Sequence, residues 1–275
     1  MDFEITDNVL WTTKGYGNSS AVNLGDKVIV IDAMLNYHYA KEWRDIVENH
    51  FKRKVDYLFL THHHGDHIFG NQSFIDIPII STESTYQIIK NNKKNLYTPD
   101  NLKEYKESNP EYSVEGLEIT LPSITFDNKL IIHGKNKVAE LIKTDGHCLG
   151  SSYLWIPKSK ALIAGDLIFN RMFPYGADPT CDLVKWQKAI EKFIELKPKL
   201  IISGHGVIAR NEDLKLINTF LSNTVEFLAI ALEEGKTFEA IISDENLPDY
   251  YSEDRQERKN LSYQNWFNQF KSVTE

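Results

Sequence analysis

The stretch of sequence that decides the fold reads Thr61-His62-His63-His64-Gly65-Asp66-His67. It places four metal-binding side chains in a His-x-His-x-Asp-His spacing within six residues. An apolar run over residues 55–60 comes directly before it and predicts a buried strand, so the histidines follow a strand end. Imidazole nitrogens and a carboxylate oxygen suit zinc and also accept iron or manganese. The motif predicts a metal site; a solvated turn with chance histidines is the alternative.

Three later segments repeat this arrangement, in which a predicted strand ends at a metal-binding side chain. They are residues 138–143 before His147, residues 161–164 before Asp166, and residues 200–202 before His205. Each alone is a weak signal, because Gly-His pairs and strand-terminal aspartates usually mark turns or helix caps. Together they argue against chance. The four strand ends supply seven candidate ligands: His62, His64, Asp66, His67, His147, Asp166 and His205.

In these residues the chain resembles the metallo-β-lactamase superfamily, over roughly residues 5–221, and all seven ligand positions of that family's dinuclear site are filled. The resemblance implies two metal ions per chain, with zinc expected and iron or manganese as alternatives. His62, His64 and His147 would hold one ion. Asp66, His67 and His205 would hold the second, with Asp166 between the two.

The resemblance also implies the fold class, an α/β protein built as a four-layer αββα sandwich. Residues 1–221 would form the family domain, and residues 222–275 a helical C-terminal extension packed on it. The sequence itself shows alternating strands and helices, with helices expected over residues 37–51, 183–196 and 211–234. Four aromatic side chains at helical spacing predict a packing stripe against the main body or a partner chain, such as a second copy in a homodimer. They are Tyr263, Trp266, Phe267 and Phe270.

The function implied is hydrolysis of a small ester, thioester, lactone or amide by a metal-bridging hydroxide. Asp66 is the expected catalytic residue, which binds the second ion and orients the hydroxide. Many zinc β-lactamases carry a cysteine and a lysine where this chain has Asp166 and Phe169, so β-lactamase activity is expected only as a side reaction. An iron-dependent oxidoreductase of the persulfide dioxygenase kind is the alternative, and it would use His64, His147 and Asp166.

Two loops are predicted to line the substrate cleft, with coverage of the sheet ends as the alternative. The proposed lining residues are Met34, Tyr37, Phe169, Arg171, Phe173 and Tyr175. For Asp32 two roles are left open, support of the ligands by hydrogen bonds or capping of the helix that starts after Asn36. Residues 83–112 predict helices that either cap the cleft or are merely solvated.

Composition fits one enzyme domain, since 275 residues with 41% hydrophobic content can bury a large core. The net charge of −8 disfavours a nucleic-acid partner, and hence a nuclease or phosphodiesterase, and leaves a small-molecule substrate. No leader or membrane-spanning apolar run is recognised, so a cytoplasmic protein is expected. Two cysteines form no disulfide framework, and we expect Cys181 to be a free thiol and Cys148 a buried apolar side chain rather than a ligand.

Overall fold

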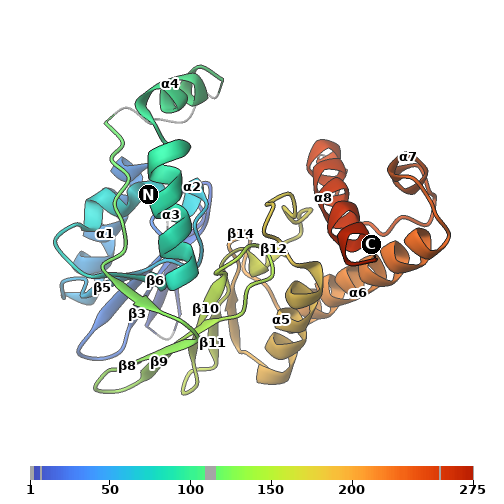
Figure 1. Cartoon of the computed structure of the whole chain (residues 1–275). Coiled ribbons are helices and arrows are strands. Elements are labelled where there is room, and N and C mark those ends of the chain that lie inside the picture. Colours follow the sequence, from blue (N-terminus) through green and yellow to red (C-terminus); the bar gives the residue numbers. More distant parts are fainter. Residues whose placement is uncertain (1–2, 7, 109–115, 254, 275) are drawn as a thin grey trace.

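Two β-sheets lie face to face at the centre of the molecule, with helices on both outer sides (Figure 1). The structure is a computed structural model and describes residues 3–6, 8–108, 116–253 and 255–274. The larger sheet contains, in spatial order, β1 (Glu4–Thr6), β2 (Val9–Thr12), β3 (Ser19–Asn23), β4 (Val28–Ile31), β5 (Tyr57–Phe59), β6 (Ile79–Thr82) and β7 (Ile124–Phe126). The smaller contains β13 (Leu200–Ile202), β11 (Ala161–Ile163), β10 (Ser152–Ile156), β9 (Val138–Lys143) and β8 (Lys129–His133).

The helices divide between the two outer faces. On the side of the larger sheet are α1 (Tyr37–Phe51), α2 (Gly65–Ile68), the 3-10 helix η1 (Phe69–Phe74), α3 (Glu83–Asn95) and α4 (Pro99–Ser108). On the side of the smaller sheet are α5 (Leu183–Leu196), α6 (Asn211–Glu233), α7 (Phe238–Ile242) and α8 (Gln256–Thr274). The predicted αββα order of layers is confirmed.

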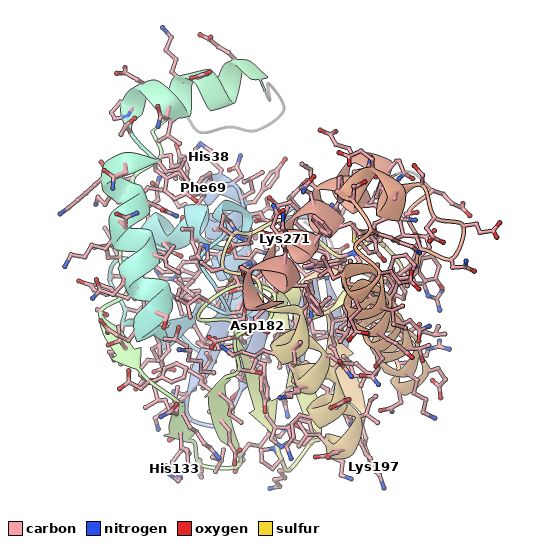
Figure 2. The ribbon with its side chains drawn as sticks, turned by 45° about the vertical axis from the view of Figure 1, so that its right-hand side comes forward. His38, Phe69, His133, Asp182, Lys197 and Lys271 are labelled. Atoms are coloured by element: carbon pink, nitrogen blue, oxygen red, sulfur yellow. The ribbon has the colours of Figure 1, made fainter. Side chains whose placement is uncertain are left out.

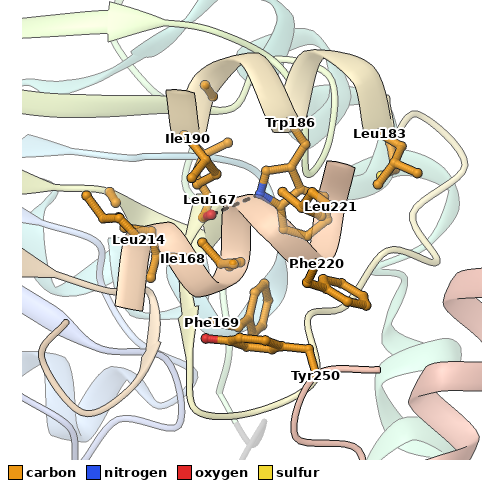
Figure 3. Close-up of a cluster of buried hydrophobic side chains, with 14 of the residues drawn as sticks. Leu167, Ile168, Phe169, Leu183, Trp186, Ile190, Leu214, Phe220, Leu221 and Tyr250 are labelled. Carbon is orange, nitrogen blue, oxygen red and sulfur yellow. Dashed lines mark hydrogen bonds between the residues drawn. The ribbon is translucent and has the colours of Figure 1, made fainter. Parts of the chain in front are cut away.

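Three apolar cores hold the four layers together. The side chains of β4 alternate between two of these cores: Ile29 and Ile31 face the smaller sheet, whereas Val28 and Val30 face α1. The third core joins the outer face of the smaller sheet to α5, α6 and α8, and Trp186 lies at its centre (Figure 3). The indole N–H of Trp186 donates to the carbonyl of Leu167 at 2.9 Å, so this buried polar group is satisfied.

The metal-binding segments meet at one edge of the two sheets. The histidine-rich stretch follows β5, and β11 and β13 run parallel, so the residues after them emerge at the same edge. After β11 comes the 3-10 turn η2 (Gly165–Leu167), and then β12 (Phe169–Asn170) pairs with β14 (His205–Gly206). This last pairing places Phe169 directly beside His205.

Local signals predicted several helix ends correctly. Asp182 caps α5, as expected, by accepting a hydrogen bond from the Lys185 N–H at 2.9 Å. The chain begins with the hairpin β1–β2, where Asn8 adopts a positive φ of 68°. Strand β7 was not predicted, because two of its three side chains are exposed and show no apolar run.

The C-terminal helices pack on the main body. Tyr263 and Trp266 of α8 are fully buried in the core that also contains Phe173 and Phe220, which confirms the predicted aromatic stripe. Helix α6 runs through residue 221, so the division between residues 1–221 and 222–275 remains a prediction and marks no break in the fold. None of the helices in the described ranges combines the length and apolar character needed to cross a bilayer.

Candidate metal centre

The first group of ligands is formed by three histidines from two loops. His64 Nδ1 lies 3.1 Å from His62 Nε2 and 3.0 Å from His147 Nε2. Asp166 Oδ2 lies 3.7 Å from the first of these Nε2 atoms and 3.6 Å from the second. The four side chains therefore direct one donor atom each at a common point, as the sequence predicted.

The second group contains Asp66, His67 and His205. Asp66 Oδ2 lies 3.0 Å from His205 Nε2 and 3.5 Å from His67 Nε2. Asp166 reaches this group as well, because its Oδ1 is 3.1 Å from His67 Nε2 and its Oδ2 is 3.4 Å from His205 Nε2. One carboxylate thus lies between two sets of donors.

Asp32 fixes the orientation of two of these ligands. Its carboxylate accepts hydrogen bonds from the Thr61 N–H and Oγ1, both at 2.7 Å, and from His67 Nδ1 at 2.9 Å. Because the Thr61 hydroxyl proton goes to Asp32, its oxygen accepts from His62 Nδ1 at 3.0 Å. Each of the two imidazoles thus has its Nδ1 engaged in a hydrogen bond and its Nε2 directed at the centre. Asn36, rather than Asp32, caps α1, so the geometry favours the supporting role for Asp32.

The other two histidines of the first group are held in the same way. His147 Nδ1 donates to the Tyr175 carbonyl at 2.8 Å, and His64 Nε2 donates to Asp178 Oδ2 at 2.9 Å. Their remaining nitrogens also face the common point, so lone pairs of three imidazoles meet at about contact distance. This arrangement is repulsive by itself, and a cation would stabilise it, as it does for metal-binding histidines with carboxylate or carbonyl partners.

Asp166 gives a second test of whether a metal fits. Its Oδ1 is buried and accepts no hydrogen bond from any described residue, although buried carboxylate oxygens are normally paired. Gly204 allows this position, because a Cβ there would lie 2.0 Å from Asp166 Oδ1. A buried carboxylate oxygen that accepts no hydrogen bond from the described residues, although His67 Nε2 lies 3.1 Å away, fits a bound cation.

The protonation of the metal-free centre differs between the two groups. Burial lowers the pKa of His147 to about 3, and the neighbouring His64 adds to this effect. Burial also lowers the pKa of His205, but the charge of Asp166 outweighs it and raises the value to about 9. The first group is therefore ready for a metal at neutral pH, whereas metal binding to the second must release a proton.

We expect metal-free protein to be most stable near the ordinary histidine pKa of 6.5. His205, with its raised pKa of about 9, contributes stability that is complete below pH 6.5 and is lost as the pH rises through 9. His147 acts oppositely, because its lowered pKa of about 3 contributes stability that is lost as the pH falls from 6.5 to 3. Melting temperatures of chelator-treated protein across this range test the prediction. His205→Gln should flatten the alkaline decline, and a flat wild-type profile between pH 7 and 9 would contradict it.

Two residues that sequence reasoning missed as site residues also act here. Asp178 binds His64 and, at 3.2 Å, His63 Nε2, and these partners hold the pKa of its carboxyl well below the usual range although burial raises it. Arg258, from α8, places its guanidinium 5.6 Å from the centre of the Phe169 ring. A lone aspartate in a turn-rich loop and an arginine in a charged helix give no recognisable sequence signal.

Asp178→Asn is expected to lower the affinity of the first group for zinc by about 10- to 100-fold, the usual effect of removing a partner of a ligating histidine. The amide keeps the shape of the side chain but weakens the hydrogen bond that fixes His64. Competition with a chromophoric chelator measures the affinity. Asp182→Asn, which changes the cap of α5 and an exposed ion pair with Lys185, is the matched control, and an equal loss in both variants would contradict the prediction.

Four predicted pocket residues lie away from the centre. Met34 and Phe173 are fully buried in apolar cores, where their side chains bury more surface than in a cleft wall. Tyr37 begins α1 and stacks on His38 with ring centres 4.0 Å apart. Arg171 lies beside Asp213, with Nε 3.7 Å from Oδ1, and is largely exposed. The structure does not bring these four residues to the metal-binding side chains, and their place in a cleft stays a prediction.

Phe169 and Tyr175 do border the ligands. The ring of Phe169 stacks on His205, with centroids 5.0 Å apart and planes 3° from parallel. The ring of Tyr175 contacts His64 edge-on at 5.9 Å, and burial raises its pKa. The two aromatic rings flank opposite groups of the centre and, as predicted, give it an apolar wall.

A cavity of about 370 Å³ opens beside Asp66. Its walls are mainly apolar and come from the loop before β3, from the turn after β4, from α2 and η1, and from α3–α4; they include Tyr16, Leu35, Phe69, Tyr97 and Leu102. Figure 2 shows α4 projecting above the rest of the chain on the side of Phe69. Part of the segment 83–112 thus borders the cleft; residues 109–112 lie outside the described ranges.

The two cysteines are free and buried. Cys148 Sγ lies 3.6 Å from His63 Nδ1 and 3.3 Å from Ser151 Oγ, on the far side of His63 from Asp178. Burial raises the pKa of its thiol well above the usual range. Its behaviour as a small buried side chain follows the expectation from sequence.

With this geometry established, comparison with known proteins identifies the family. The sequence model of the Metallo-beta-lactamase superfamily matches residues 12–205, well over half of the chain. The chain belongs to the metallo-β-lactamase superfamily. Members of this superfamily are metal-dependent hydrolases. All seven predicted ligands lie inside the matched residues, whereas α6, α7 and α8 lie beyond them.

The curated proteins that resemble this chain carry different names. It is 25% identical over 154 residues to a beta-lactamase-like protein 2 homolog of Caenorhabditis elegans, covering 56% of this chain and 43% of the relative. It is 27% identical over 189 residues to ribonuclease Z of Leuconostoc mesenteroides, covering 64% and 54%. The chain thus spans about half the length of the curated relatives it matches.

Solved structures share the fold of this superfamily member. A metallo-beta-lactamase from Pontibacter korlensis superposes with a TM-score of 0.61 at 18% identity and covers 81% of this chain and 100% of its own. About a fifth of the present chain therefore has no counterpart there. At this identity the likeness establishes the fold alone.

Proposed function

We propose that this protein is a dinuclear metal-dependent hydrolase, with zinc as the expected metal, that acts on a small ester, thioester, lactone or amide. One observation carries the proposal: two sets of donors meet at Asp166, whose Oδ1 is buried and accepts no hydrogen bond from the described residues. His62, His64 and His147 would hold one ion. Asp66, His67 and His205 would hold the other.

When bound, the two ions would acidify a water molecule and polarise the carbonyl that is attacked. The chain's own residues supply orientation and proton transfer. Asp66 is the ligand that borders the cavity, with its Oδ2 turned toward His67 and His205. Its Oδ1 would accept a hydrogen bond from the nucleophile and hold the proton that the leaving group needs. Asp32 and Asp178 keep the imidazoles in the tautomers required.

The cavity supports a small substrate with apolar parts. Its walls are aromatic and aliphatic, and its volume of about 370 Å³ is in the range that small-molecule sites have. Many zinc β-lactamases carry a lysine at the position of Phe169, and this chain lacks it. β-Lactam hydrolysis is therefore proposed only as a side reaction.

Nuclease activity is the second candidate, favoured by the similarity to ribonuclease Z. The net charge of −8 weighs against it, because binding a phosphate backbone depends on clustered cations. The iron-dependent alternative needs an ion at His64, His147 and Asp166, which also lie together. Metal identity separates that alternative from the hydrolase.

Metal content per chain, measured by elemental analysis of protein purified without added metal, is the decisive test. About two zinc ions per chain, with hydrolysis in a panel of thioesters, lactones, esters and lactams, would support the proposal. About one iron per chain would favour the oxidoreductase. Zinc-loaded protein that cleaves precursor tRNA and none of the panel would favour the nuclease.

A further inference from the structure

Arg258 lies over the aromatic wall of the metal centre. Its guanidinium carbon is 5.6 Å from the centre of the Phe169 ring and 5.8 Å from that of Tyr175. Phe169 stacks on His205 of one group, and Tyr175 contacts His64 of the other. A single cation thus lies next to the two side chains that flank the two halves of the site.

No carboxylate within the described ranges forms an ion pair with Arg258. Its Nη1 donates to the Phe173 carbonyl at 3.4 Å, a bond that orients the guanidinium but leaves most of its five N–H donors for another acceptor. The charges of Asp66 and Asp166 act on it from the centre, while that of Arg255 opposes them. The side chain is half-buried, so it remains accessible from one side.

Unpaired half-buried cations are costly, because burial disfavours the charged form; here burial lowers the pKa of the Arg258 guanidinium. Packing alone does not require a charge at this position, since an apolar side chain could also cover two aromatic rings. Cation–π contacts recover part of the cost, and they hold the guanidinium in one place. A preoriented guanidinium whose donors are mostly unused by the described residues is suited to bind a carboxylate in bidentate fashion.

We propose that Arg258 binds a carboxylate group of the substrate and selects esters, thioesters, lactones or amides that carry a carboxylate near the bond that is cleaved. The inference rests on the proposed hydrolase function and names its substrate class. It places the anchor in the C-terminal helix α8, outside the residues matched by the family. Arg258 is therefore a specificity-determining residue rather than a catalytic one.

A matched pair of substrates tests this assignment in zinc-loaded protein: 4-nitrophenyl hydrogen glutarate, which is anionic, and its neutral methyl ester. Arg258→Met is expected to raise KM for the anionic ester by about 10- to 100-fold, the usual worth of a charged hydrogen-bonded pair, with little change in kcat. KM for the neutral ester should stay the same. Arg258→Lys should retain part of the preference. Lys271→Met, which removes an exposed cation from the same helix, is the control (Figure 2).

Binding measured without turnover separates this inference from the proposed function. In calorimetric titrations of zinc-loaded protein with ketones, which cannot be hydrolysed, 5-oxohexanoate should bind wild type at least about tenfold more tightly than Arg258→Met, and the neutral heptane-2,6-dione should not distinguish them. If wild type hydrolyses neither ester but shows this difference, the anion site stands and the hydrolase proposal fails for this class. If Arg258→Met affects both esters equally, or neither, the assignment of Arg258 is overturned while hydrolysis stands.

Discussion

Replacement of Asp166 by alanine is expected to prevent retention of two metal ions per chain and to reduce hydrolysis by about 10³-fold. Asp166 contacts both sets of donors, at 3.1 to 3.7 Å, so its removal takes one ligand from each ion. Loss of Lewis-acid stabilisation costs several kcal/mol of transition-state energy, and each 1.4 kcal/mol is about tenfold in rate. Elemental analysis and initial rates on the same preparation measure both effects.

The control for Asp166→Ala is Asp213→Ala, which removes another buried carboxylate. Asp213 accepts a hydrogen bond from the Arg210 N–H at 2.8 Å in the capping box of α6, away from the ligands. This variant should melt at a lower temperature yet keep its metal. If Asp166→Ala retained two ions per chain, Asp166 would not lie between them as proposed.

Asp66→Asn is expected to reduce turnover by about 10²- to 10⁴-fold, the range for loss of a positioned proton-transfer group. The amide keeps an oxygen for metal binding but cannot take up the proton. Three imidazoles and Asp166 still hold the first ion, so at least one metal per chain should remain. The fold should be little affected, because Asp66 is a partly exposed ligand beside the cavity.

Asp76→Asn provides the comparison for Asp66→Asn. Asp76 is an exposed carboxylate that pairs with Arg44 of α1, and its loss should leave turnover within about twofold, as for most surface changes. Near-normal turnover in Asp66→Asn with full metal content would exclude the proton-holding role. A loss of both metal and turnover would instead make Asp66 a ligand only.

The meeting of the seven candidate ligands could be predicted from sequence because each follows directly from a local pattern. A short apolar strand followed by turn residues determines where the metal-binding side chain after it leaves the sheet. Parallel strands such as β11 and β13 then bring the side chains after their carboxyl ends together. Most helix bounds follow from periodicity in the same way, whereas the order of the layers was predicted from the resemblance to the family. Nothing local, however, determines which surface packs over the completed site.

The pocket residues illustrate this limit. Met34 and Leu35 are adjacent apolar residues, yet Met34 is in the core and Leu35 lines the cavity. The positive φ of Met34, 65°, breaks the simple alternation of sides that an extended chain would have. Asp178 and Arg258 were missed for another reason. They lie beside the site because α8 packs against a loop about 80 residues earlier in the chain. The hydrogen bond from Arg258 to Phe173, for example, joins residues 85 positions apart.

Hydrogen bonds between α8 and the loop before α5 limit how the chain can be shortened or recombined. Asn265 donates to the carbonyls of Gly176 and Asp178, at 2.8 and 2.7 Å, and Ser262 accepts from the Gly176 N–H at 2.9 Å. These bonds reach main-chain atoms of the loop that orients His64. A fragment ending after α6 would therefore contain every ligand and still lack the support of one of them. The shortest chain that contains every candidate ligand is therefore shorter than the chain needed to orient all of them. For this reason the C-terminal helices cannot be exchanged as an independent module.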